Sequence, residues 1–260
     1  VHVPAQRQPG IGLQPHQGVL GAGRVQHDVD RGDQAAVDSL EGADVADLGV
    51  ADVIGADDHL APAARGLGEA FARACVAQGA RVLVIRNTVQ RAQETFAACS
   101  GSDLLLTVGG CPTLHHSRFA AEDRSLLDAA VEDAIGKESP VGGRIVIGTQ
   151  TLEQSLDLCA DLLITDLCPM DVLLQRVGRL HRHHRPRPAG FETARAIVLC
   201  PPGGLAPLTA RAENGLGAFD SSRGLSGVYL DVSGLAATLE QIGAHPVWTI
   251  PAMNRALVEA

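Results

Sequence analysis

The chain has 260 residues, of which 45% are hydrophobic and 3% aromatic, and it carries a formal net charge of −9 at neutral pH. This length allows one or two domains with a sizeable core. No apolar run approaches the roughly 18 residues that a membrane-spanning helix needs, so no membrane partner is expected. Six scattered cysteines without C-x-x-C spacing favour reduced thiols in a prokaryotic cytoplasm over disulfides or zinc.

Residues 1–64 differ in composition from the rest of the chain. They are rich in Gly, Ala and Asp, show no sustained helix or strand period, and hold most of the negative charge: residues 1–60 contain three arginines and ten acidic residues. One interpretation is a disordered acidic leader, and the other is sequence unrelated to the domain that follows. The dipeptide His27-Asp28 lacks further ligands at metal spacing, so no metal site is predicted.

Strand and helix patterns alternate from residue 65 onward. Apolar β-rich runs predict strands at 81–85, 104–108, 144–148, 162–165 and 194–199. Helical spacing of apolar residues predicts helices at 67–75, 89–97, 121–136, 170–178 and 235–242. The alternation predicts an α/β domain over residues 65–200, with a mostly parallel sheet and helices on both faces. Residues 201–260 begin with Pro201-Pro202-Gly203-Gly204 and are expected to form a linker and extension.

The most informative stretch is residues 149–182, TQTLEQSLDLCADLLITDLCPMDVLLQRVGRLHR. Arg176, Arg179 and Arg182 recur every three residues, so a helix and the turn after it can point them into one crevice. Guanidinium groups are planar, always charged and bind phosphate with two hydrogen bonds. The alternative is an exposed basic helix end that is favourable to the helix dipole. This stretch holds two polar clusters, at residues 149–157 and 175–182. Because open α/β sheets bind ligands at the carboxyl ends of their strands, we expect both clusters at that edge of the sheet.

These residues resemble a known family. QRVGRLHR resembles motif VI of superfamily 2 helicases, and TQTLEQSLDL resembles their motif V. Together with TDLCPMD they are similar to the type I CRISPR-associated helicase–nuclease family, and the resemblance extends over residues 65–260. It implies a RecA-like, P-loop NTPase-type fold of the helicase C-terminal domain, in an ATP-dependent DNA helicase of antiviral defence. Another superfamily 2 helicase acting on DNA or RNA is the alternative, which the EQSLD and TDLCPMD forms disfavour.

The resemblance also implies roles for individual residues. The arginine fingers of an ATP site would be Arg179 and Arg182. The other ATP-binding residues would be Gln175, Arg176, Asp157 and Gly178. Contacts to nucleic acid would come from Thr149, Gln150, Asn87, Thr88, Ser117 and Arg118. Capping and loop hydrogen bonds are the alternative for Asp157, Asn87, Thr88, Ser117 and Arg118. His181, His183 and His184 lie among arginines that would repel a cation, so phosphate contact or a solvated loop is favoured over a metal site.

The 260 residues contain no G-x-x-x-x-G-K-[ST] loop, and the only lysine is Lys137. In the family, ATP and Mg²⁺ are bound mainly by a first RecA-like domain, and an HD nuclease lies further upstream. We therefore expect half of a motor that is inactive alone. Its partners would be that first domain or the rest of the helicase, single-stranded DNA and a CRISPR surveillance complex. The abrupt change near residue 65 favours a truncated or frame-disrupted gene, and the alternative function is a non-catalytic nucleic-acid-binding remnant.

Overall fold

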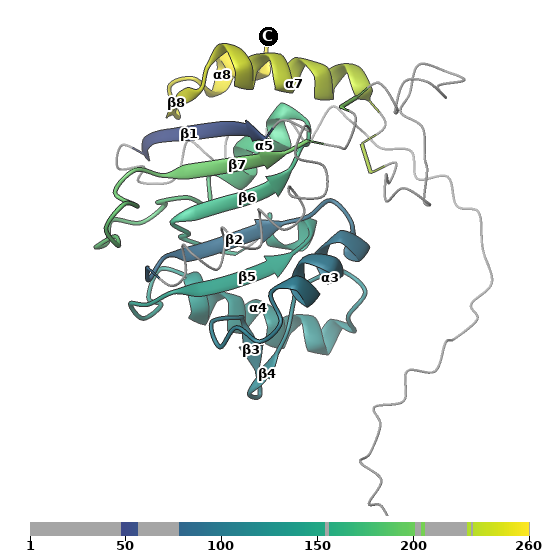
Figure 1. Cartoon of the computed structure of the whole chain (residues 1–260), viewed down its shortest axis with the longest axis vertical. Helices are drawn as coiled ribbons and strands as arrows, with labels where there is room; N and C mark the ends of the chain where they lie inside the picture. Colours follow the sequence, from purple (N-terminus) through teal and green to yellow (C-terminus); the bar gives the residue numbers. More distant parts are fainter. Residues whose placement is uncertain are drawn as a thin grey trace, which may run out of the picture. The chain divides into compact units, whose positions relative to one another are not determined.

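The computed structural model describes residues 78–153, 156–200, 204–205, 228–229 and 231–259, and the backbone of 48–56, all within the compact unit Asp44–Ala260. A six-stranded sheet in the order β5-β2-β6-β7-β1-β8 forms the centre of this unit (Figure 1). The strands are β1 (Leu48–Ala56), β2 (Arg81–Ile85), β5 (Arg144–Gly148), β6 (Leu162–Asp166), β7 (Arg195–Leu199) and β8 (Val247–Ile250). All neighbouring pairs are parallel except β1 with β8. The predicted α/β fold with a mostly parallel sheet is confirmed.

Helices cover both faces of the sheet. Successive side chains of a strand point to opposite faces, so Leu83 and Ile85 of β2 enter one core while Val82 and Val84 enter the other. The first core is completed by α4 (Ala121–Ile135), α5 (Met170–Val177), α7 (Val232–Ala244) and α8 (Asn254–Val258). The second core is completed by α3 (Val89–Ala98). Burial on both faces explains why the central strands read as continuous apolar runs.

Local signals set the helix starts that the sequence predicted. Thr88 caps α3, because its hydroxyl oxygen accepts a hydrogen bond from the amide of Arg91 at 3.2 Å. Pro169 precedes α5 with a φ of −55°, which suits the entry to a helix. Glu122 and Asp123 lie in the first turn of α4, where negative charge favours the helix dipole. The helices predicted at 121–136 and 170–178 are confirmed to within one residue.

The predicted strand at 104–108 is wrong in its extent. Only Leu105 bridges to Ile145 of the main sheet. The next residues leave the sheet as a hairpin of β3 (Thr107–Val108) and β4 (Cys111–Pro112), joined by Gly109 and Gly110. Both glycines have positive φ, which glycine adopts without strain and which lets the chain reverse in two residues.

The sheet extends beyond the predicted domain limits of 65 and 200. Strand β1 comes from the segment where no regular element was predicted, and it pairs with β7 from Asp52↔Arg195 to Ala56↔Leu199. At the other end, α7, β8 and α8 come from the predicted extension. The leader predicted for 1–64 otherwise falls outside the described residues, as do His27-Asp28 and the helix predicted at 67–75. No described helix has the length and apolar character needed to cross a membrane.

Candidate functional site

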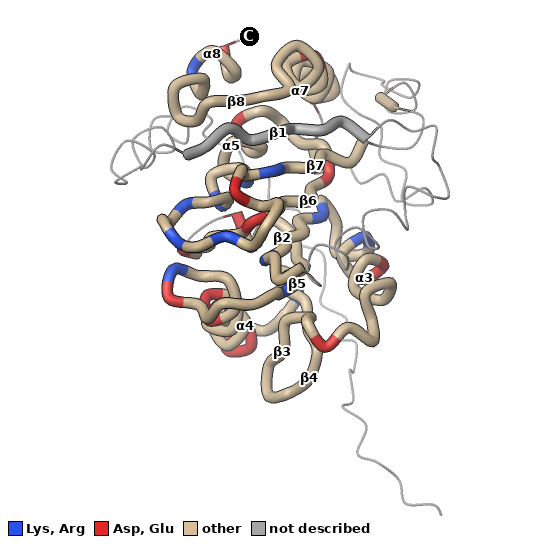
Figure 2. The backbone as a smooth tube through the Cα atoms, turned by 60° about the vertical axis from the view of Figure 1, so that its left-hand side comes forward, with Lys and Arg blue, Asp and Glu red and all other residues tan. Residues whose placement is uncertain are grey.

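The predicted site residues fall into two groups at opposite ends of the strands. Asn87 and Gln150 follow the carboxyl ends of β2 and β5. Arg179 lies at the amino end of β6, because its carbonyl accepts from the amide of Ala160 and the next bond runs from His181 N to Ala160 O. Lys and Arg segments alternate with Asp and Glu segments in the loops beside this end of the sheet (Figure 2). The expectation that all these residues line the carboxyl edge is therefore wrong for Arg179 and its neighbours Arg182 and Asp157.

The path of α5 explains why Arg179 and Arg182 lie at the amino end of β6. Three residues separate this helix from β6, and it runs back over the face of the sheet, so the turn that follows it returns to the start of that strand. The link from β5 to β6, residues 149–161, crosses the same face in the same sense, from the carboxyl edge to the amino edge, and contains only the short 3₁₀ turn η3 (Gln150–Leu152) among its described residues. Motif V and motif VI therefore lie against each other over the middle of the sheet.

Three arginines hold this link. Arg176 binds the carboxylate of Glu153, with Nε and Nη2 at 2.8 and 2.6 Å from Oε1. Arg179 donates to the carbonyl of Leu156 at 2.5 Å and to that of Glu153. Arg182 Nε lies 3.1 Å from Asp157 Oδ1. The spacing of three brings the arginines against one segment, so their recurrence has a structural use as well as the predicted catalytic one.

Arg176 is fully buried, and all five of its N–H groups face acceptors. Burial alone would lower its pKa, but the surrounding Cys168, Glu153 and Tyr229 raise it, so the guanidinium stays charged. With no N–H group left over in this conformation, the guanidinium of Arg176 holds its neighbours together. Besides Glu153, its partners are Thr165 Oγ1 (2.5 Å), the carbonyl of Asp166 (3.1 Å), Asn87 Oδ1 (3.1 Å) and Tyr229 OH (3.1 Å).

Arg182 is more accessible. Its side chain is 36% exposed, and its partner Asp157 is 47% exposed and also binds His183 Nε2 at 2.8 Å. Arg179 is partly buried, and burial followed by the charge of Arg182 lowers its pKa. Gly178 ends α5, and Gln175 lies partly buried one turn before Arg179. The predicted ATP-binding group is therefore contiguous, with Arg182 and Asp157 at its exposed end.

His181 provides a pH test of this turn. It has a positive φ of 47°, and burial, followed by the charge of Arg187, lowers its pKa to about 4. Because the unfolded imidazole titrates near 6.5, the folded state binds fewer protons between about pH 6.5 and 4. We expect His181 to contribute stability above pH 6.5 that is lost as the pH falls toward 4. A His181→Asn variant, whose residue tolerates positive φ, should lose less stability over this range in urea titrations at several pH values. Parallel losses in both proteins would contradict the assignment.

The group at the carboxyl ends is tied together by side-chain bonds. Gln150 Nε2 donates to the carbonyl of Asn87 at 2.9 Å, and Asn87 Nδ2 donates to the carbonyl of Leu167 at 2.7 Å. Thr149 is only 3% exposed, so its hydroxyl does not face solvent in this conformation. Thr88 is used as the α3 cap. These residues meet as predicted, but their polar groups serve the fold as well.

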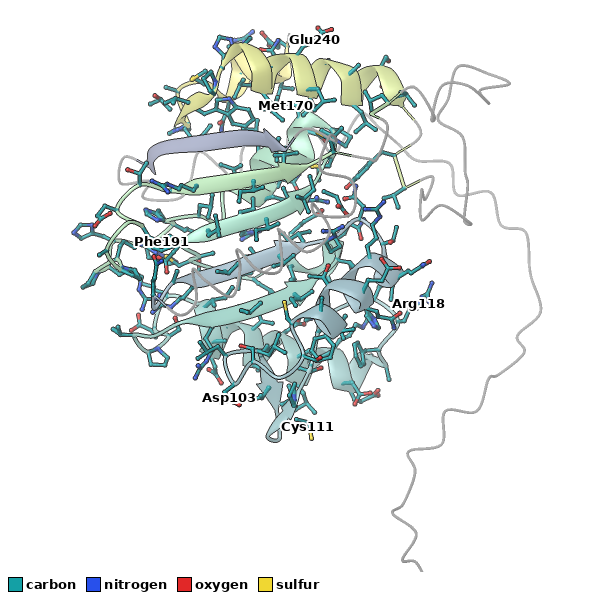
Figure 3. The ribbon with its side chains drawn as sticks, in the orientation of Figure 1. Asp103, Cys111, Arg118, Met170, Phe191 and Glu240 are labelled. Carbon is teal, nitrogen blue, oxygen red and sulfur yellow. The ribbon has the colours of Figure 1, made fainter. Side chains whose placement is uncertain are left out.

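Ser117 and Arg118 are exposed beyond the bridge His115↔Gly148 at the end of β5. Figure 3 labels Arg118 on the side of the molecule where the central strands end. These two side chains, unlike Thr149, are accessible to solvent at this edge.

Sequence reasoning assigned no role to Glu153, Thr165 or Tyr229, which surround Arg176. Tyr229 is the only tyrosine of the chain, and this was the one local signal that could have singled it out. Among the described residues, no group of three or more His, Cys, Asp and Glu side chains is placed to hold a metal ion.

Comparison with known proteins decides the relationship of the central segment. Residues 78–185 match the family described as CRISPR-associated nuclease/helicase Cas3, C-terminal. This match supports the resemblance that motifs V and VI indicate. Cas3 of Streptococcus thermophilus is 44% identical over 125 residues, 46% of this chain and 13% of the relative. Cas3 of Escherichia coli K12 is 44% identical over 127 residues, 48% of this chain and 14% of the relative. The chain thus spans only a small part of the length of these Cas3 proteins.

Solved Cas3 structures have the same fold. The crystal structure of T. fusca Cas3 aligns with 82% of this chain and 24% of its own, at 27% identity and a TM-score of 0.62. The T. fusca Cas3–AMPPNP structure aligns with 83% of this chain and 24% of its own, at 30% identity and a TM-score of 0.61. The RecA-like α/β fold expected from the motifs is therefore confirmed, and the Cas3-like segment contains both arginine-rich and motif V residues.

Proposed function

We propose that this chain acts as the second RecA-like part of a Cas3-type ATP-dependent DNA helicase in antiviral defence. The observation that carries the proposal is the partly exposed ion pair between Arg182 of motif VI and Asp157 of motif V, which lies within the Cas3-like segment 78–185. ATP and Mg²⁺ would be held mainly by a first RecA-like domain that meets this surface. Single-stranded DNA and a CRISPR surveillance complex are the further proposed partners.

Arg182 is the guanidinium best placed to act on a phosphate. Its bond to Asp157 joins two partly exposed groups, and such pairs contribute only about 0–1 kcal/mol, so exchanging the carboxylate for a phosphate costs little. During transfer the γ-phosphate gains charge on its outer oxygens, which an arginine stabilises. Arg179, held by two carbonyls, would fix the turn from which Arg182 reaches out.

The proposed contacts to single-stranded DNA lie at the carboxyl ends of β2 and β5. Ser117 and Arg118 are exposed there, and Gln150 and Asn87 are held together beside them. Hydroxyl and guanidinium donors bind phosphate oxygens without regard to base sequence. We propose that Ser117 and Arg118 contact the backbone of single-stranded DNA, and that the buried Thr149 shapes the turn.

The test is ATP turnover with single-stranded DNA present. The chain alone should release phosphate no faster than background, since its 260 residues contain no Walker A loop. Mixing with a first RecA-like domain from a similar helicase should give turnover. Arg182→Ala should reduce that turnover by about 10³-fold or more, whereas Arg124→Ala, a matched change on the exposed side of α4, should leave it unchanged.

Two other outcomes have clear meanings. Turnover by the chain alone that disappears in an Arg179→Ala, Arg182→Ala double variant would mean that a complete nucleotide site forms here, and the half-motor proposal would fail. Binding of single-stranded DNA without turnover in any mixture would favour the non-catalytic nucleic-acid-binding function.

A further inference from the structure

A buried imidazole lies beside the turn that carries Gln150. His115 is 2% exposed, and both of its ring nitrogens have partners. Nε2 lies 2.6 Å from Oδ1 of Asp128 on α4, and Nδ1 lies 2.8 Å from the hydroxyl oxygen of Thr151 in η3. The backbone is fixed as well, because the amide of His115 donates to Ile147 and its carbonyl accepts from Thr149. The ring therefore connects α4 to the motif V turn in one orientation.

The positions of the protons follow from the chemistry of the three groups. Asp128 is 45% exposed, and a solvated carboxylate at neutral pH can only accept, so the hydrogen of this bond belongs to His115 Nε2. A neutral imidazole carries one ring hydrogen, and when this hydrogen is on Nε2 the Nδ1 atom has none. Nδ1 is then a bare acceptor, and its bond to Thr151 requires the hydroxyl proton. The Thr151 hydroxyl has only that proton, so the rest of its oxygen presents lone pairs.

We propose that Asp128, His115 and Thr151 form a positioning relay that makes the Thr151 hydroxyl an acceptor toward bound nucleic acid. This inference rests on the proposed function, single-stranded DNA binding at this edge. Phosphate oxygens accept and cannot donate, so Thr151 does not pair with them, whereas the amino and ring N–H groups of bases can donate to it. Within the site, Arg118 then serves the backbone and Thr151 serves a base edge. Asp128 and His115 act through Thr151 and do not touch the ligand.

Nitrogen NMR of the histidine-labelled full chain at pH 7.5 tests the relay without any nucleic acid. A His115→Gln variant assigns the ring signals. We expect a protonated Nε2 and an unprotonated Nδ1, with the Nδ1 signal shifting in Thr151→Val but not in Thr107→Val, which removes a hydroxyl from the exposed hairpin strand β3. Two protonated nitrogens, or a hydrogen on Nδ1, would overturn the relay, because the Thr151 proton would then be free to point outward.

Binding of fluorescently labelled single-stranded DNA to the chain tests whether Thr151 contacts a base edge. Thr151→Val should weaken binding of a mixed-sequence single-stranded DNA by about fivefold, the usual effect of one hydrogen bond, and Thr151→Ser should restore it. Binding of a matched strand without bases should be the same in all three proteins. Equal losses on both strands would overturn the assignment to a base edge. If neither strand binds, the nucleic-acid role and the ligand assignment both fail, while the NMR result still decides whether the relay exists.

Discussion

Replacing Arg176 with alanine is expected to lower the free energy of unfolding by about 3–5 kcal/mol, as removal of one partner of a buried ion pair does. Glu153 is only 6% exposed, so its carboxylate would be left buried without its ion-pair partner. Asn87 and Thr165 would also lose the donors that satisfy them. Urea denaturation followed by circular dichroism measures the change.

The control is Arg124→Ala, which removes the same group from the exposed surface of α4 and should change stability by less than about 0.5 kcal/mol. A double variant, Arg176→Met with Glu153→Leu, should recover part of the loss, because an apolar pair of similar volume needs no charge partner. A loss below about 1 kcal/mol for Arg176→Ala would show that the buried pair is not what holds motif V to α5.

Gly148→Ala is expected to destabilise the fold by about 2–3 kcal/mol through overpacking. A Cβ at this position would lie 2.5 Å from the carbonyl oxygen of His115 and 2.6 Å from Cδ1 of Leu152. The carbonyl cannot move away freely, because it accepts from the amide of Thr149. Thermal unfolding should show a lower midpoint temperature for this variant.

The matched change is Gly243→Ala in α7, where a Cβ meets open space and φ is not positive. Alanine is favoured over glycine in a helix, so this variant should gain about 0.5–1 kcal/mol. Opposite signs for the two substitutions are the expected result. A Gly148→Ala protein as stable as the original chain would mean that the segment around His115 can shift.

The elements that sequence predicted well are those with strong apolar contrast. Residues 81–85 and 144–148 are apolar runs bounded by polar or glycine residues, and their strand limits match the structure. Strand β1 was missed because its sequence, LGVADVIGA, mixes glycine and alanine with few large apolar residues and gives no clear period. The stretch 104–108 was predicted as one strand because it is mostly apolar and contains no glycine or proline that would indicate where the chain leaves the main sheet.

The candidate site was predicted in composition but not in geometry. The spacing of the three arginines predicts that a helix and the turn after it point them into one crevice, and all three do bind the segment from Glu153 to Asp157. Which of them is buried depends on Tyr229, which lies 53 residues away in sequence from Arg176. Such a pairing leaves no periodic trace in the sequence. The position of Arg179 and Arg182 at the amino end of β6 depends on the length of α5.

The strand order bears on how the chain folds as it is synthesised. Four adjacent strands, β5, β2, β6 and β7, come from one continuous stretch, residues 81–199. Strand β1 emerges from the ribosome first, yet its register partner for Asp52 is Arg195, near the end of that stretch. Pairing at such sequence separation is slow to form. The four-stranded centre can therefore assemble before β1 joins, and β8 closes the edge last.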